Sequence, residues 1–270
     1  MAEQSEPGQY ERIEVRRDGA KLDIALARAD QRNALDFKMW DELGHVMNEV
    51  VSHDDTIRVV TLTGQGDAFC AGVDFQAIGD SLQVERHQYP SFIRRWAGVA
   101  DSFERVAQPT VALLNGPAVG AGMEIALACD LRIASERAVF AMPQLQMGIV
   151  PDAGGTSRLA RAAGETIAKD VILTGRVVGA EEALRCGIVS RVVAHDELAS
   201  TGSEIAEGLA QLPWPSTYFA NVAVEAGARL DPRRAADLEG MADQVMLRED
   251  AVWERVESFM QSKGLKGLGS

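Results

Sequence analysis

The chain has 270 residues, of which 46% are hydrophobic, and its 40 acidic and 27 basic side chains leave a formal charge of −13. This length predicts one large domain, or a core with an appended unit, and the composition excludes a disordered or fibrous chain. The acidic balance argues against a binder of nucleic acid or of anionic membranes, because such surfaces need a basic face. Three cysteines without metal or disulfide spacing, and no apparent signal peptide, predict a cytoplasmic protein without a metal site.

The first half of the chain is predicted to alternate strands with helices. Apolar residues alternate on both sides of Asp18-Gly19 and predict a hairpin over residues 13–26. A helical spacing follows from Asp36, the expected N-cap, and residues 58–62 then form a short buried strand. Further short strands are predicted at residues 110–114, 130–134 and 138–140.

An uncharged stretch covers residues 106–123, which is about the length of a membrane helix. It contains two prolines and three glycines, which are typical of a buried strand followed by a turn. We therefore expect no membrane span here.

Helices dominate the second half, where residues 188–193 form the last expected strand. The late helices are predicted at residues 196–212, 215–229, 232–248 and 250–262. Their apolar faces indicate a docking or oligomerisation unit. We accordingly divide the chain into a core, residues 1–195, and a helical C-terminal oligomerisation region, residues 196–270.

Two glycine-bearing turns at the ends of apolar strands are the first candidates for a site. They cover residues 68–74 and 115–124. The second turn leads straight into an apolar helical run, so its free N–H groups lie at a helix N-terminus, which favours negative charge. Two N–H groups that face each other can hold the oxyanion of a carbonyl compound, whereas tight turns and close packing are the alternative.

Two carboxylates lie near these turns. Glu124 stands inside the apolar run that follows the second turn. Burial would raise its pKa toward a range useful for proton transfer, and a structural ion pair is the alternative. Asp152 follows Pro151, and that pattern by itself favours a helix N-cap.

Other common sites have no support in the sequence. It contains no phosphate-binding loop, no dinucleotide-binding turn and no HExxH motif, and its four histidines show no ligand spacing. We expect no prosthetic group.

Six segments, in this order, resemble the crotonase, or enoyl-CoA hydratase/isomerase, superfamily. They are RNAL at residues 32–35, FCAGVD at 69–74, NGPAVGAGME at 115–124, CD at 129–130, GIVPDAGGT at 148–156, and LTG at 173–175 followed by residues 180–189. The resemblance covers residues 10–263. It implies an α/β fold, a spiral of repeated ββα units with a C-terminal α-helical trimerisation region. It also implies acyl-CoA substrates, with coenzyme A as part of the substrate, and a homo-oligomer, either a trimer or a dimer of trimers.

The resemblance also assigns roles to single residues. It places the two oxyanion-binding N–H groups on Val73 and Ala121, and an acid/base role on Glu124. Phe259 and Lys263 lie near positions that complete a neighbouring subunit's coenzyme A site. The segments that match the family's coenzyme A contacts, largely through backbone, contain Arg32, Asn33, Ala34, Leu35, Ala71, Gly72 and Asp74.

Two positions bear on the reaction that the resemblance implies, and a third, Gln76, bears on the match to the coenzyme A site. Gln144 stands where the family's hydratases carry a second glutamate, and an amide cannot donate or take a proton. Gln76 replaces a lysine that is usual in the family. Asp152 matches a catalytic aspartate of dienoyl-CoA isomerases and the nucleophile of a related dehalogenase.

The replacement of the second glutamate by Gln144 favours double-bond isomerisation over hydration. Glu124 is then the main acid/base, Asp152 a second carboxylate, and Gln144 orients water or substrate. Three alternatives remain: hydration of 2-enoyl-CoA, dienoyl or aromatic acyl-CoA chemistry at Asp152, and acyl-CoA binding without turnover. Residues 79–105 match the family's variable acyl-binding segment, although simple helix packing is the alternative. The aromatic residues of that segment are Tyr89, Phe92, Trp96 and Phe103.

Overall fold

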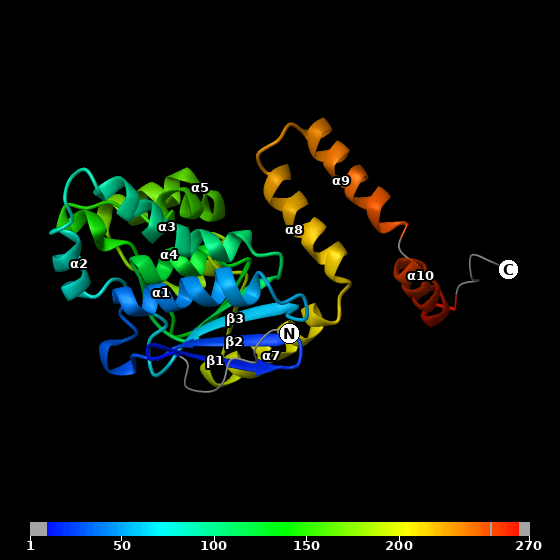
Figure 1. The fold of residues 1–270 in the computed structure, drawn as a ribbon, viewed down its shortest axis with the longest axis horizontal. Coiled ribbons are helices and arrows are strands. Elements are labelled where there is room, and N and C mark those ends of the chain that lie inside the picture. The colour runs from blue at the N-terminus through cyan, green and yellow to red at the C-terminus, as the bar shows by residue number, and fades with distance from the viewer. Residues whose placement is uncertain (1–9, 249, 265–270) are drawn as a thin grey trace. The chain divides into compact units, whose positions relative to one another are not determined.

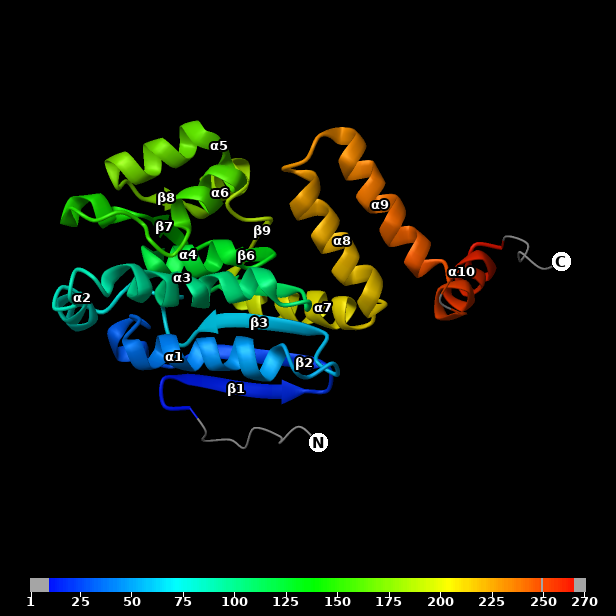
Figure 2. The same ribbon diagram turned by 45° about the horizontal axis from the view of Figure 1, so that its top comes forward.

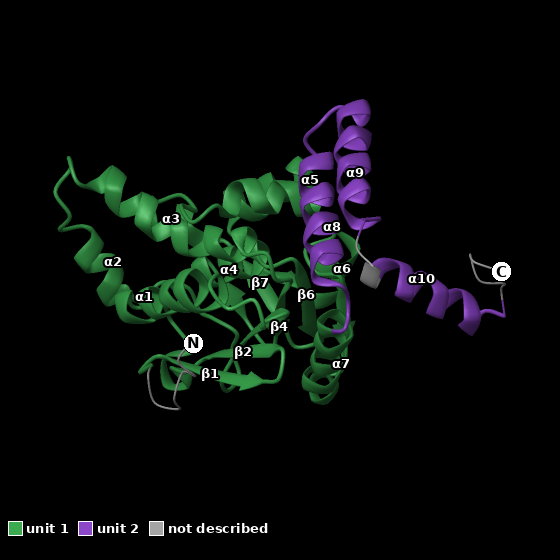
Figure 3. Cartoon of the chain, turned by 45° about the vertical axis from the view of Figure 1, so that its right-hand side comes forward, with its two compact units in different colours: residues 1–210 green, residues 211–270 purple. Residues whose placement is uncertain are grey.

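The structure is a computed structural model that describes residues 10–248 and 250–264. The chain divides into two compact units, residues 1–210 (unit 1) and residues 211–270 (unit 2), which are coloured separately in Figure 3.

A six-stranded sheet forms the base of unit 1 (Figures 1 and 2). It begins with the predicted hairpin, in which β1 (Ile13–Asp18) pairs antiparallel with β2 (Lys21–Leu26). The other strands run parallel in the order β1-β2-β3-β4-β6-β9. These are β3 (Val59–Gly64), β4 (Thr110–Leu114), β6 (Leu131–Ser135) and β9 (Arg191–Val193).

A second sheet contains three short strands, of which the first pair is parallel and the second pair antiparallel. Its order is β5 (Ala118–Val119), β7 (Val139–Ala141) and β8 (Val178–Gly179). A helix follows each short strand, namely α4 (Ala121–Ala128), α5 (Gly155–Thr174) and α6 (Ala180–Arg185). The chain passes from β4 through β5 to α4, and from β6 through β7 to α5, which is the repeat of the predicted spiral of ββα units.

Further helices of unit 1 cover the large sheet and the region of the second turn. Asp36 caps α1 (Phe37–His45), as predicted, by accepting a 2.8 Å hydrogen bond from the Met39 N–H, and a π-helical turn (Val46–Val51) extends the helix. Helices α2 (Phe75–Ser81) and α3 (Tyr89–Arg105) follow, and α3 packs against α1 and α4. Short 3₁₀ helices lie at Ala29–Gln31, Pro143–Met147 and His195–Glu197.

Helix α7 (Leu198–Ala210) belongs to unit 1, although the sequence division at residue 195 placed it with the C-terminal helices. Its buried Leu198 and Ala206 join a hydrophobic cluster with Val59, Val111 and Ile133 of the large sheet. An amphipathic helix can cover a sheet or another helix, and here the sheet buries its apolar face. The compact units therefore divide one helix later than the sequence suggested.

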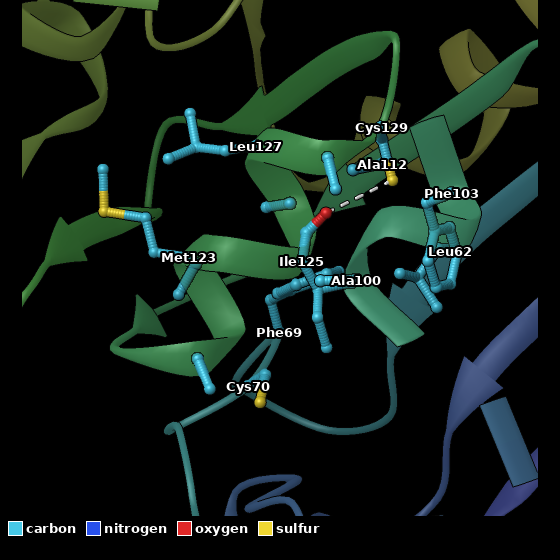
Figure 4. Packing of buried hydrophobic residues seen from close by; sticks show 14 of the residues in the cluster. Leu62, Phe69, Cys70, Ala100, Phe103, Ala112, Met123, Ile125, Leu127 and Cys129 are labelled. Carbon is cyan, nitrogen blue, oxygen red and sulfur yellow. Dashed lines mark hydrogen bonds between the residues drawn. The ribbon is translucent and has the colours of Figure 1, made fainter. Parts of the chain in front are cut away.

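Helix α4 lies in the centre of the core, and every one of its residues is buried. Figure 4 shows Ile125 beside Phe69 and Ala100, with Cys70 close by. The thiol of Cys129 contacts the carbonyl oxygen of Ile125 at 3.6 Å. Burial raises the pKa of Cys70 and of Cys129 to about 12, so both are unreactive packing residues at neutral pH.

Unit 2 contains α8 (Trp214–Gly227), α9 (Pro232–Met246) and α10 (Asp250–Ser262), close to the predicted bounds. Helices α8 and α9 pack against each other, and the Asp231 side chain caps α9 by accepting from the Arg233 N–H. Several large apolar side chains of this unit are exposed: Val224, Leu230, Met241, Val245, Leu247, Trp253 and Phe259. Within the described residues of the whole chain, no helix has the length and hydropathy that a membrane crossing requires.

Candidate active site

The two glycine-bearing turns meet at the edge of the second sheet. Cys70 pairs with Ala118, so the first turn runs beside the strand that opens the second turn. A Cβ at Gly72, where φ is +101°, would lie 2.9 Å from the Val119 oxygen and 3.8 Å from the Ala121 nitrogen. Only glycine therefore allows this approach, and it brings the backbone on both sides together without an intervening side chain.

The N–H groups of Val73 and Ala121 both lie at this junction. Neither donates a hydrogen bond to an acceptor within the part of the chain that the structure describes. Ala121 is the first residue of α4, where helix geometry leaves the N–H without an internal partner and the helix dipole favours negative charge. The two groups predicted to bind an oxyanion are thus close together.

Glu124 lies on the first turn of α4 and is only 1% exposed. Its Oε1 accepts two backbone hydrogen bonds, from Ala153 N–H at 3.0 Å and from Gly155 N–H at 2.9 Å. Its Oε2 accepts one, from the Gln144 side-chain amide at 3.1 Å. Oε2 therefore keeps more free acceptor capacity than Oε1.

Burial raises the pKa of Glu124 to about 7. The negative charge of Asp152 raises it too, whereas the Gly155 and Ala153 N–H groups and the Arg158 cation hold it down. Near neutral pH the carboxyl group consequently exists in both protonation states, which suits a group that takes and returns a proton.

The segment before α5 wraps around this carboxylate. A Cβ at Gly155 would lie 2.6 Å from Glu124 Cγ, so a glycine is needed for the backbone to reach the carboxylate. The helix N-cap is Gly154, with φ +89°, and no side chain caps the helix.

The helix N-cap, which the Pro151-Asp152 pattern by itself favoured over a catalytic role for Asp152, is therefore not the role of this residue. The amides of Ala153 and Gly155 at the start of α5 bind Glu124 instead. The Asp152 side chain is half-buried beside the cleft described below, and burial raises its pKa.

Gln144 is buried on the short helix that follows β7. Its amide nitrogen binds Glu124, and its Oε1 is buried with no hydrogen-bond partner among the described residues. The site thus combines one deeply buried carboxylate with one amide.

A cleft of about 940 Å³ opens beside these groups. Glu124, Asp152, Gln144 and both candidate N–H residues line it. Its other lining is largely apolar and includes Phe37, Phe75, Leu82, Tyr89, Phe92 and Trp96.

Three of the four aromatic residues of the segment 79–105 line this cleft. They are Tyr89, Phe92 and Trp96, whereas Phe103 lies in the core at 1% exposure. The rings of Phe92 and Trp96 lie 6.5 Å apart and nearly parallel, and Phe37 meets both edge-on. The segment therefore supplies one wall of the cleft as well as core packing.

Known proteins share this architecture. A family model described as enoyl-CoA hydratase/isomerase matches residues 17–263. This chain belongs to the enoyl-CoA hydratase/isomerase family. A short-chain-enoyl-CoA hydratase of Clostridium acetobutylicum is 30% identical over 255 residues, covering 94% of this chain and 96% of the relative. A carnitinyl-CoA dehydratase of Shigella flexneri is 38% identical over 200 residues, 74% of each chain.

One similar protein has been solved with a bound ligand. The protein, from Thermobifida fusca YX, was solved in complex with acetoacetyl-CoA. Its TM-score is 0.81 at 27% identity, and the match covers 87% of this chain and 94% of that one. The family and its fold are thus shown for this chain.

The residues that the family resemblance linked to coenzyme A fall into two groups. Ala34, Ala71, Gly72 and Asp74 line the cleft. The others, Arg32, Asn33 and Leu35, are not among its lining residues.

Two of these other residues hold the loop instead. Asn33 is fully buried, and its amide binds the carbonyl oxygens of Gln65 and Ala68, while Leu35 is buried and pairs with Val73 through backbone. Their side chains shape the first turn, so any contact of theirs with coenzyme A would be through backbone.

Phe259 and Lys263 lie at the end of unit 2, where the Lys263 ammonium is 5.7 Å from the centre of the Phe259 ring. All residues that line the cleft belong to unit 1. That Phe259 and Lys263 complete the coenzyme A site of a neighbouring subunit stays a prediction.

Sequence reasoning missed Arg158, which lies on α5 and is 3% exposed. Its guanidinium donates to the Ala153 carbonyl and to Asp101 and Glu104 of α3. An arginine on the first turn of a helix gives no sequence signal of burial, because its acidic partners lie 57 and 54 residues earlier in the chain.

Proposed function

We propose that this chain shifts the double bond of an enoyl-CoA by proton transfer at Glu124. One observation carries the proposal: the cleft holds the buried Glu124 carboxylate, whose pKa is near neutrality, close to two backbone N–H groups without an acceptor among the described residues. Its hydrogen-bonded neighbour Gln144 is an amide. The acetoacetyl-CoA complex of the Thermobifida fusca relative supports a thioester as the ligand.

The proposed chemistry begins with the thioester carbonyl between the N–H groups of Val73 and Ala121. Ionised Glu124 removes a proton from C2 of a 3-enoyl-CoA, and the electron pair moves onto the carbonyl oxygen, which the two N–H groups stabilise. Glu124 then returns the proton to C4, and the double bond moves from C3–C4 to C2–C3. One carboxylate performs both transfers, and no water enters the reaction.

Hydration makes a different demand. Water must be deprotonated as it attacks C3, and C2 must receive a proton, a task that the family's hydratases share between two glutamates. Gln144 cannot take or give that proton. Its Nε2 instead donates to Glu124 Oε2 and stabilises the ionised base.

Parallel assays with a 3-enoyl-CoA and with crotonyl-CoA test the proposal. We expect isomerisation of the 3-enoyl-CoA to be faster than hydration of crotonyl-CoA. We expect Glu124→Gln to lower the isomerisation rate by about 10²–10⁴-fold. Rapid hydration of crotonyl-CoA that survives Glu124→Gln would refute the mechanism.

Gln144→Glu provides a gain-of-function prediction. A second carboxylate about 3 Å from Glu124 Oε2 can activate water, so we expect hydration of crotonyl-CoA to rise by at least about tenfold. The two carboxylates would share a proton at neutral pH, as close like charges do. Gln83→Glu is the control, because Gln83 is exposed and does not line the cleft, and it should leave hydration unchanged. An unchanged hydration rate in a folded Gln144→Glu variant would show that the amide does not limit hydration.

Asp152 supports a second candidate, proton transfer on a dienoyl or aromatic acyl-CoA. It lines the cleft, has a raised pKa and caps no helix. The aromatic wall made by Phe92 and Trp96 would pack well against a flat acyl group. In this case Asp152→Asn abolishes activity, and Glu124→Gln is tolerated.

We further propose that unit 2 joins copies of this chain into a homo-oligomer. Its exposed apolar side chains, including Val224, Met241 and Phe259, exceed what a free surface usually presents in so short a segment. We expect light scattering to give a trimer or hexamer, and Val224→Glu with Met241→Glu to shift the mass toward one chain. The double variant Glu204→Gln with Glu207→Gln in unit 1 should keep the parental mass. A parental mass of one chain would exclude the assembly.

A further inference from the structure

We propose that Arg158 is a positioning residue that holds the Ala153 carbonyl and thereby keeps the N–H groups of Ala153 and Gly155 on the Glu124 carboxylate. The functional meaning of this inference rests on the proposed role of Glu124. Its structural part can be tested without any substrate.

The segment 153–155 is enclosed between the Arg158 guanidinium and the Glu124 carboxylate. The peptide groups of this segment face both ways: the Ala153 oxygen accepts from Arg158 Nη1 at 2.5 Å, while the Ala153 nitrogen donates to Glu124. A Cβ at Gly154 would lie 2.1 Å from Arg158 Nη1, and one at Gly155 would lie 2.6 Å from Glu124 Cγ. The two glycines therefore admit a cation on one side and a carboxylate on the other.

Helix α3 fixes the position of the guanidinium. Arg158 Nη2 donates to Asp101 at 2.7 Å and to Glu104 at 2.8 Å. Buried ion networks contribute little net stability, and Arg158 Nε has no partner among the residues the structure describes. Net stability therefore does not explain why Arg158 is buried to 3% exposure. Its hydrogen bond to the Ala153 carbonyl does explain it.

Arg158 acts on Glu124 mainly through the hydrogen bonds. Asp101 and Glu104 offset its charge, and its direct attraction contributes less to the Glu124 pKa than either backbone N–H does. Asp152 is the other charge that faces Glu124. Three further cations face the carboxylates of α3: Arg105 pairs with Asp101, Arg161 pairs with Glu104, and Arg132 interacts with Glu104 and with Asp130.

Arg158→Met therefore removes the hydrogen bond to the Ala153 carbonyl and one positive charge near Glu124. Both changes favour the protonated form of Glu124. The readout is the titration of Glu124 in the full chain labelled with ¹³C at glutamate side-chain carboxyls, with the resonance assigned by its loss in Glu124→Gln. We expect the midpoint to rise from about 7 by about one pH unit. Arg161→Met is the matched control, because Arg161 also pairs with Glu104 but is not bonded to Ala153, and its midpoint should equal the parental one.

Arg158→Met leaves two carboxylates without their buried partner and can fail to fold. The triple variant Asp101→Asn, Glu104→Gln and Arg158→Met removes those charges and should fold, because neutral replacement of a buried ion network is tolerated. A parental midpoint in either folded variant would overturn the proposal. The acid limb of kcat/KM should move with the midpoint. A shifted midpoint in a chain that turns over no enoyl-CoA would refute the proposed function and leave the positioning role intact.

Discussion

Replacing Glu124 with glutamine is expected to lower turnover of a 3-enoyl-CoA by about 10²–10⁴-fold, the usual contribution of a positioned acid/base group. The change keeps the size of the side chain and an oxygen that can accept from the Ala153 and Gly155 N–H groups. Binding of acyl-CoA should therefore remain close to that of the parent. Steady-state kinetics together with calorimetric binding separate the two effects.

Asp152→Asn is the comparison for this variant. Asp152 lines the same cleft but is less deeply buried than Glu124. If Glu124 is the main base, we expect Asp152→Asn to lower turnover of the 3-enoyl-CoA by less than about tenfold. The reverse order, a severe loss with Asp152→Asn and a mild one with Glu124→Gln, would move the reaction to Asp152.

Glu124→Gln also changes how the stability of the folded chain depends on pH. Burial raises the pKa of Glu124 from the ordinary 4.5 to about 7 in the folded protein. Between these values the folded chain holds a proton that the unfolded chain releases, so the stability from this group is complete below about pH 4.5 and is lost as pH rises to about 7. Glu124→Gln has no proton to release, so we expect it to lack this loss of stability. Between pH 4.5 and about 7 its free energy of unfolding should rise relative to that of the parent by up to about 3 kcal/mol. Urea unfolding at pH 4.5 and pH 8 measures it.

Much of the fold could be predicted because its signals are local. The hairpin around Gly19 shows an alternating pattern, and Asp36 precedes a helical spacing that it does cap. The apolar run after the second turn predicted the buried helix α4 and made Glu124 conspicuous. Strand β9 is shorter than predicted, since only Arg191–Val193 pairs with β6.

What could not be predicted depends on contacts between distant segments. Asp152 looks like a helix cap because the sequence does not show that Glu124 takes the amides at the start of α5. Arg158 looks like an exposed helical residue because its partners Asp101 and Glu104 come from α3. Likewise, the apolar face of α7 does not reveal whether a sheet or another helix will cover it.

Gly72→Ala is expected to cause the second large loss of kcat, because it separates the N–H groups of Val73 and Ala121. Its Cβ would lie 2.9 Å from the Val119 oxygen, so the two turns must separate and the Val73 N–H moves away from the Ala121 N–H. Loss of one oxyanion donor costs about 10²–10³-fold in kcat. We expect a loss of this size with a smaller change in KM.

The φ of +101° at Gly72 means that alanine also introduces backbone strain, of about 1–2 kcal/mol. Gly19→Ala separates strain from chemistry: Gly19 has φ +58°, and a Cβ there would meet nothing within 4 Å. It should lower the midpoint of thermal unfolding but leave kcat unchanged. If Gly72→Ala also keeps the parental kcat, the Val73 and Ala121 N–H groups do not stabilise the transition state. If it alone loses kcat, the close approach of the two turns serves catalysis, because both variants carry strain and only one separates the N–H pair.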